Sequence, residues 1–101
     1  ALWRTLGTTL LVPLIEEAFF RGYILARLDT GKPSARLLAV ALSTILFALL
    51  HGRIILAGIA GLLFAAAMLR RGRLGDAVIA HVVANTTVAL AAWLTGQWSL
   101  I

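Results

Sequence analysis

The sequence contains no cysteine, which excludes disulfide bonds, thiolate metal ligands and a cysteine nucleophile. Charged residues are also scarce: they make up 13% of the 101 residues, whereas 61% are hydrophobic. In soluble domains about one residue in four is charged. A soluble domain of this length has too small an interior to bury so large an apolar share. We therefore expect lipid to be the main solvent and the bilayer to be a partner.

A recognisable signal peptide is missing as well, because no basic segment precedes a short apolar stretch with a small-residue cleavage site. The chain starts at Ala1, and we interpret it as a piece of a longer protein. Its net charge of +5 does not indicate a nucleic-acid partner, since the basic residues lie between apolar stretches and form no polar, aromatic-containing face. Such placement is typical of membrane anchors.

Four apolar stretches predict an all-α fold, a polytopic transmembrane bundle of about four membrane helices in one domain over residues 1–101. The predicted helices cover residues 2–28, 34–51, 54–70 and 74–94. Turn-rich breaks separate them, with Ser34 as the expected N-cap of the second helix. Pro13 lacks a backbone donor and favours a kink a few residues before Glu16.

Basic residues flank the first and third breaks, and alternating crossings place both breaks on one side of the membrane. They are Arg27, Lys32, Arg36, Arg70, Arg71 and Arg73. Because basic loops favour the cytoplasm, we expect that side to be cytoplasmic. The other side carries at most Arg4 and Arg53. In the third stretch, Gly58, Gly61 and Ala65 recur at helical spacing and predict close helix packing.

Few ionisable or strongly polar side chains lie within the apolar stretches. They are Glu16, Glu17, Arg21, His51, Asp76, His81 and Asn85. A charged side chain at the bilayer centre costs about 3 kcal/mol, so such groups normally face a cavity or a partner and are functional candidates. Asp76 lies near a predicted helix start, where a capping role is the simpler interpretation.

The adjacent carboxylates Glu16 and Glu17 point about 100° apart on a helix, whereas Glu17 and Arg21 are four residues apart and share a face. Glu17 and Arg21 should therefore form a charge-compensated pair. This leaves Glu16 to meet a group from another helix and makes it the better chemical candidate. The alternative is that the cluster only solvates a helix end at a wet interface.

His51 ends the second stretch, while His81 and Asn85 are four apart in the fourth and share a face. A lone histidine on an apolar helix is more often a packed core residue. Here, however, two histidines, an asparagine and the unpaired Glu16 come from three helices. They suffice to bind a metal, or to polarise water and stabilise an oxyanion.

A divalent metal such as zinc is an open alternative for this site. Its natural ligands are His51 and His81, with Glu16 or Asn85 as a third, because catalytic zinc usually has three protein ligands. Depth along the helices also needs an explanation. At about 1.5 Å per residue, His81 is shallow, Glu16 central and His51 near the far side, so tilted helices or other boundaries are required.

Three motifs in order carry a family resemblance. Residues 16–22 (EEAFFRG), 47–51 (FALLH) and 81–85 (HVVAN) resemble the E-E-x-x-x-R, F-x-x-x-H and H-x-x-x-[ND] motifs of the CPBP family, the CAAX proteases and bacteriocin-processing or Abi proteins. The resemblance covers about residues 12–87. It implies a glutamate-dependent intramembrane protease that hydrolyses a peptide bond of a membrane-associated or lipid-modified substrate, in a prokaryotic cytoplasmic membrane.

The resemblance also implies a role for each motif residue. Glu16 would activate the water, His51 and His81 would hold the water or a metal, and Asn85 would help to stabilise the oxyanion. Structural support is implied for Glu17, Arg21 and Phe47.

Two other classes of function stay open. The first is a non-catalytic membrane scaffold or bacteriocin-immunity protein that keeps the polar cluster for helix packing. The second is a small ion or proton carrier, although carriers more often show repeated, broken helices. Other intramembrane proteases are disfavoured, because the sequence has no H-E-x-x-H helix and no second membrane-embedded aspartate.

Overall fold

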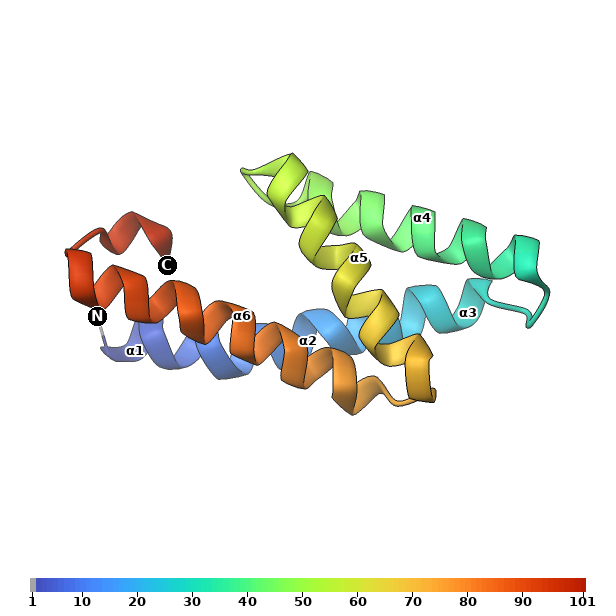
Figure 1. The fold of residues 1–101 in the computed structure, drawn as a ribbon, viewed down its shortest axis with the longest axis horizontal. Helices are drawn as coiled ribbons and strands as arrows, with labels where there is room; N and C mark the ends of the chain where they lie inside the picture. The colour runs from blue at the N-terminus through green and yellow to red at the C-terminus, as the bar shows by residue number, and fades with distance from the viewer. Residues whose placement is uncertain (1) are drawn as a thin grey trace.

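The computed structural model describes residues 2–101, and within that range it contains helices and no strands, which confirms the all-α fold class. Figure 1 shows a long, composite first helix followed by three further helices and a short terminal turn. The first helix consists of α1 (Leu2–Leu6), η1 (Gly7–Leu11), α2 (Val12–Phe19), η2 (Phe20–Leu25) and α3 (Ala26–Leu28). The others are α4 (Pro33–Leu49), α5 (Ile54–Arg71), α6 (Leu74–Thr95) and η3 (Trp98–Leu100).

Two π-helical turns, η1 and η2, interrupt the first helix without ending it. The turn η1 comes directly before Val12 and Pro13, where the missing backbone donor of proline breaks the regular hydrogen-bond ladder. The expected irregularity therefore lies just upstream of Pro13. The turn η2 carries Arg21. Such π turns inside α-helices frequently occur at functional sites.

The two capping expectations are wrong. The helix α4 begins at Pro33 with Lys32 as its N-cap, so Ser34 lies within the first turn. Proline is favoured there because its φ angle suits a helix and its missing donor costs no hydrogen bond. The N-cap of α6 is Arg73 rather than Asp76, and the Asp76 carboxylate instead forms a two-bond ion pair with Arg71 at 2.7 and 2.9 Å. This ion pair closes the short turn between α5 and α6.

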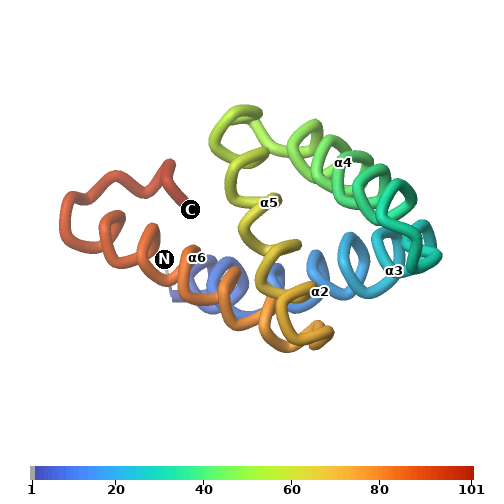
Figure 2. Tube along the Cα trace, turned by 45° about the vertical axis from the view of Figure 1, so that its right-hand side comes forward, coloured from blue at the N-terminus to red at the C-terminus, as the bar shows by residue number. Residues whose placement is uncertain are grey.

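The helices form an elongated wedge with principal extents of 46 × 23 × 17 Å. Both views show α2 and α6 side by side, while α4 lies on the other side of α5, which crosses between α4 and α6 at a steep angle (Figures 1 and 2). The helix α4 packs on the η2 and α3 part of the first helix. As a result, α4 and α6 diverge from one another, and a space lined by several helices opens along the middle of α5.

Close packing around α5 depends on small residues. Gly61 is buried, and a Cβ atom at this position would lie 3.0 Å from Nη2 of Arg21 and 3.1 Å from Cδ2 of Phe47. Gly58 is in looser contact, with its nearest neighbour, Cβ of Ala48, at 3.9 Å. The core is correspondingly rich in alanine and phenylalanine. The predicted close contact of the third helix is therefore present, and it is tightest at Gly61.

The outer surface of the bundle is apolar. Large hydrophobic side chains are exposed along every long helix, including Ile55 at 81% and Leu94 at 77% exposure. A soluble monomer rarely exposes so continuous an apolar surface, whereas a bundle in lipid does. The helices α5 (18 residues) and α6 (22 residues) are long and apolar enough to cross a membrane, and α4 is a shorter apolar helix of 17 residues.

Candidate active site

A cleft of about 560 Å³ opens between the first helix, the end of α4, α5 and α6. Glu16, His51, His81 and Asn85 all line it. The structure therefore brings together the four side chains that the sequence analysis singled out, from α2, α6 and the joint between α4 and α5. Most of the remaining wall is apolar, with side chains from the first helix, α4, α5, α6 and the C-terminal end of the chain. A polar group in this cleft therefore interacts in a poorly hydrated environment.

Glu16 faces His51 across the cleft. Oε2 of Glu16 lies 3.3 Å from Nε2 of His51, and both side chains are partly exposed, at 20% and 34%. The other ring nitrogen of His51, Nδ1, lies 2.6 Å from the carbonyl oxygen of Phe47. Because a carbonyl only accepts hydrogen bonds, Nδ1 carries the proton and Nε2 is the nitrogen that faces Glu16. A water molecule beside both groups would meet a carboxylate and an oriented imidazole.

Glu17 lies on the other side of the helix and is fully buried. Its Oε2 accepts hydrogen bonds from Nη1 of Arg21 at 2.9 Å and from Nδ1 of His81 at 2.7 Å. The expected pair of Glu17 and Arg21 is therefore present, and the contact with His81 is an addition. The adjacent carboxylates thus each meet a different histidine, Glu16 at the end of α4 and Glu17 on α6.

Arg21 is fixed from three sides. Besides Glu17, its guanidinium donates a hydrogen bond to the carbonyl oxygen of Gly61 at 2.7 Å and stacks over the rings of Phe47 at 4.6 Å and Phe64 at 5.6 Å. Cation–π contacts of this kind gain strength when the ion is desolvated, as it is here at 0% exposure. Arg21 therefore connects the first helix, α4 and α5 from behind the cleft and compensates the charge of Glu17.

Phe47 packs against both histidines of the site. Its ring lies 4.3 Å from the ring of His51 and 5.8 Å from that of His81, measured between centroids. His81 in turn stacks on Phe64 at 4.4 Å with an interplanar angle of 18°. Both imidazoles are therefore held by aromatic contacts as well as by hydrogen bonds at Nδ1. In each ring Nε2 is the nitrogen that no described neighbour engages through a hydrogen bond.

Asn85 lies one turn beyond His81 on α6. Its Nδ2 donates a hydrogen bond to the backbone carbonyl of Thr8 at 2.8 Å. That carbonyl belongs to the π-helical turn η1. The amide has two hydrogens on Nδ2, so one remains for a ligand in the cleft. The contact with Thr8 fixes the orientation of the amide and ties α6 to the first helix.

The comparison with protein families agrees with this geometry. A family model described as Type II CAAX prenyl endopeptidase, Rce1-like, matches residues 1–87. The chain belongs to this family. The match includes Glu16, His51, His81 and Asn85, and it confirms the resemblance that the three motifs carry. No curated protein and no solved structure matches the chain.

Membership of the Rce1-like family establishes the class of molecule. The chain is an integral membrane protein of a protease family, of the CAAX endopeptidase type. The apolar outer surface and the two long apolar helices agree with this assignment. A polar, histidine-containing cleft enclosed by such helices is also what hydrolysis within a membrane requires, because water and charge must be shielded from the lipid.

The Rce1-like cleft as it stands offers a thin set of metal ligands. Within residues 2–101 no three histidine, aspartate or glutamate side chains are arranged to hold a metal ion. His51 and His81 do show one feature of metal ligands, a second ring nitrogen held by a hydrogen-bond acceptor. The assignment of His51 and His81 as ligands, with Glu16 or Asn85 as a third, stays a prediction.

Several residues of the Rce1-like site were not predicted from the sequence as part of it. Phe64 stacks on His81, the carbonyl of Thr8 holds Asn85, and Gly61 accepts the hydrogen bond from Arg21. Two of these three contacts are made by backbone carbonyls, which no side-chain motif encodes. Gly61 could have been suspected, because a small residue on a helix permits the close approach of another side chain. Arg53, which also lines the cleft, had been noted only as a loop residue.

Proposed function

We propose that this protein is a glutamate-dependent intramembrane endopeptidase that hydrolyses a peptide bond of a membrane-associated or lipid-modified substrate. The observation that carries this proposal is the convergence of Glu16, His51, His81 and Asn85 on one cleft, with Glu16 next to His51 at 3.3 Å. A non-catalytic scaffold would not require a partly exposed carboxylate and an oriented imidazole that both face a cavity. The basic loops then face the cytoplasm of a prokaryotic cell.

Glu16 acts as the general base in this mechanism. A water molecule beside both the carboxylate and Nε2 of His51 gives a proton to Glu16, and its oxygen attacks the carbonyl carbon of the scissile peptide bond. The resulting tetrahedral intermediate collapses when the C–N bond breaks. The proton held by Glu16 moves to the departing amine nitrogen, so the products are a carboxylic acid and an amine. His51 orients the water throughout, because its other nitrogen is fixed by Phe47.

His81 and Asn85 stabilise the negative charge that develops on the carbonyl oxygen. Asn85 offers its remaining amide hydrogen, while His81 offers Nε2–H when its ring is protonated. Glu17 fixes the orientation of the His81 ring, because its Oε2 accepts the hydrogen bond from Nδ1 at 2.7 Å and leaves Nε2 on the cleft side. Donors fixed before the reaction need no rearrangement in the transition state, and a single such donor contributes roughly 100- to 1,000-fold in rate. No step uses a metal ion.

The decisive experiment measures cleavage of a fluorogenic lipidated peptide by the protein in liposomes. We expect Glu16→Gln to abolish cleavage without loss of folding, and His51→Ala and His81→Ala each to lower kcat by at least about 100-fold. Asp76→Asn is the matched control, because Asp76 is a carboxylate on a helix end whose partner is Arg71, outside the cleft. Full proteolysis by the folded Glu16→Gln variant would reject the base, and a wild-type protein that cleaves nothing would favour a scaffold.

A further inference from the structure

The segment that follows α6 turns back toward the candidate active site. The helix α6 ends at Thr95, and Gly96 comes next with a φ of +73°. Glycine adopts this left-handed conformation without strain, and it ends the helix and reverses the chain. Both views show the following residues running back from the end of α6 in the direction of the joint between α4 and α5 (Figures 1 and 2). We call residues 97–101 the strap.

The strap forms part of the cleft wall. Ser99, Leu100 and Ile101 line the same cavity as Glu16 and His51. Leu100 and Ile101 are partly buried there. Burial of such side chains against other apolar groups is favourable. The strap therefore occupies space beside the proposed catalytic groups that a substrate in the cleft would need.

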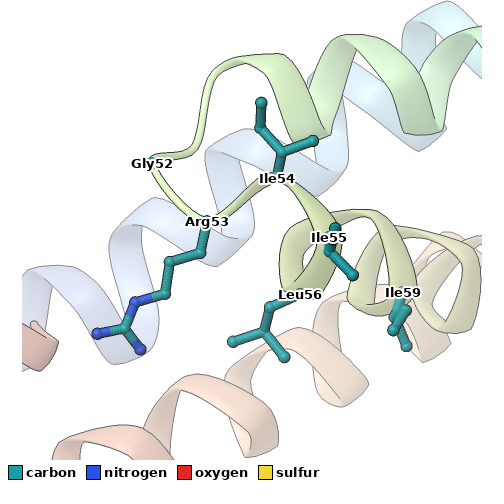
Figure 3. A pocket seen from close by; sticks show the side chains of 6 residues that line it. All are labelled: Gly52, Arg53, Ile54, Ile55, Leu56 and Ile59. Atoms are coloured by element: carbon teal, nitrogen blue, oxygen red, sulfur yellow. The ribbon is translucent and has the colours of Figure 1, made fainter.

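The start of α5 lies between the cleft and a second hollow. Gly52, Arg53 and Leu56 line both cavities, each of about 560 Å³. Figure 3 shows the Arg53 and Leu56 side chains extending away from the three isoleucines of the second hollow. These exposed isoleucines are Ile54, Ile55 and Ile59. Because the two cavities share three residues, the cleft opens here toward the apolar surface of the bundle.

Exposed contacts from the first helix and from α6 hold the strap in place. Nη2 of Arg4 donates a hydrogen bond to the backbone carbonyl oxygen of Trp98 at 3.1 Å. The Trp98 ring packs edge-to-face on the ring of Trp93, with 5.0 Å between centroids. Trp93 in turn donates a hydrogen bond from Nε1 to Oγ1 of Thr5 at 2.9 Å. A single contact of either kind changes an equilibrium by only about 2- to 10-fold, so the strap is held weakly enough to open.

We propose that the strap closes the candidate active site in the resting protein and swings out about Gly96 to admit a substrate. This inference rests on the proposed function and adds a regulation of the same site. In the closed state Leu100 and Ile101 shield the Glu16 carboxylate from lipid, where a charge is costly. A substrate and the strap then compete for the cleft. The apparent affinity for substrate is therefore lowered in proportion to the fraction of molecules that are open.

The first test of the strap needs no turnover. The sequence contains no cysteine, so Ala60→Cys, on the cleft wall in α5, introduces a single thiol whose reaction rate with a soluble maleimide in detergent micelles reports access to the cleft. In this background we expect Arg4→Gln to raise the rate about 2- to 10-fold, the effect of losing one hydrogen bond. Trp98→Ala loses the contact with Trp93 but keeps the backbone carbonyl, and it should raise the rate similarly. Arg70→Gln is the matched control, because Arg70 lies at the other end of α5.

Kinetics then tests the competition between strap and substrate. With the fluorogenic lipidated peptide, Arg4→Gln should lower KM by about the same 2- to 10-fold and leave kcat unchanged, because no group that touches the reacting atoms is altered. An unchanged thiol rate in both variants, or an unchanged KM, would overturn the proposal. A lower kcat/KM would also overturn it, since the strap would then help to bind the substrate. Thiol rates that respond as expected in a protein that cleaves no peptide would support the strap and reject the proposed function alone.

Discussion

Substitution of Glu17 by glutamine tests how the two adjacent carboxylates divide their work. Glu17 is fully buried and is the acceptor for both Arg21 and His81. Glutamine keeps the shape but removes the charge, which leaves the guanidinium of Arg21 buried at 0% exposure without a counter-ion. Breaking a buried pair in this way costs about 3–5 kcal/mol. The retained hydrogen bond to Gly61 and the two aromatic contacts favour the lower end of that range.

Glu16→Gln is the matched comparison, because it makes the same chemical change one residue away. The Glu16 side chain is 20% exposed and its ion-pair contact is with His51 at 3.3 Å. A partly hydrated contact of this length contributes at most about 1 kcal/mol. We therefore expect the free energy of unfolding in detergent micelles, measured by reversible denaturant titration, to fall by at least about 2 kcal/mol more in Glu17→Gln than in Glu16→Gln.

A double variant adds the sharper control. Replacing Glu17 by glutamine and Arg21 by methionine removes the uncompensated charge, so the double variant should be more stable than Glu17→Gln alone. Equal stability of the Glu17→Gln and Glu16→Gln variants would refute the view that Glu17 and Arg21 hold the bundle together behind the cleft. A double variant no better than the single one would show that the lost contact with His81, rather than the charge of Arg21, dominates.

The remaining predictions concern packing and pH. Gly61→Ala should destabilise the bundle by about 1–3 kcal/mol, since the new Cβ would lie 3.0 Å from the Arg21 guanidinium, whereas Gly58→Ala should be neutral or slightly stabilising. Thermal unfolding of both variants checks this, and equal shifts would contradict it. A hydrogen bond from the Gly31 backbone, and then Arg36, lowers the pKa of Asp29. Asp29→Asn should therefore reduce stability at neutral pH, and its difference from wild type should vanish as the pH falls through that lowered pKa.

Local signals in the sequence were enough to place the helices. Apolar stretches and turn-rich breaks are properties of neighbouring residues, so α5 begins at the expected residue, Ile54, and α6 ends within one residue of its expected end. The two capping expectations failed for a different reason. At Ser34 the preceding proline determined where the helix starts. The Asp76 carboxylate pairs with Arg71 at the end of the preceding helix and does not cap the backbone of α6.

Residue counts along the helices place Glu16, His51 and His81 at different depths in the membrane, although the three side chains line one cleft. Counting residues assumes that the helices run parallel to one another. In the structure α5 crosses between α4 and α6 at a steep angle (Figure 1), and the joint between α4 and α5 brings His51 to Glu16. His51 at the end of α4 and Glu16 in α2 therefore meet although they belong to different depths along their own helices.

The sequence by itself determined the class of the protein, the four-helix order and the polar residues that we propose as catalytic, because hydrophobicity, helix breaks and motif spacing are encoded along the chain. Only the tertiary structure decided which group meets which. The contacts of Glu16 with His51, of Glu17 with His81 and of Asn85 with the carbonyl of Thr8 join residues 35, 64 and 77 positions apart. Such pairs depend on the crossing angles of packed helices, which the side chains of the whole bundle set together.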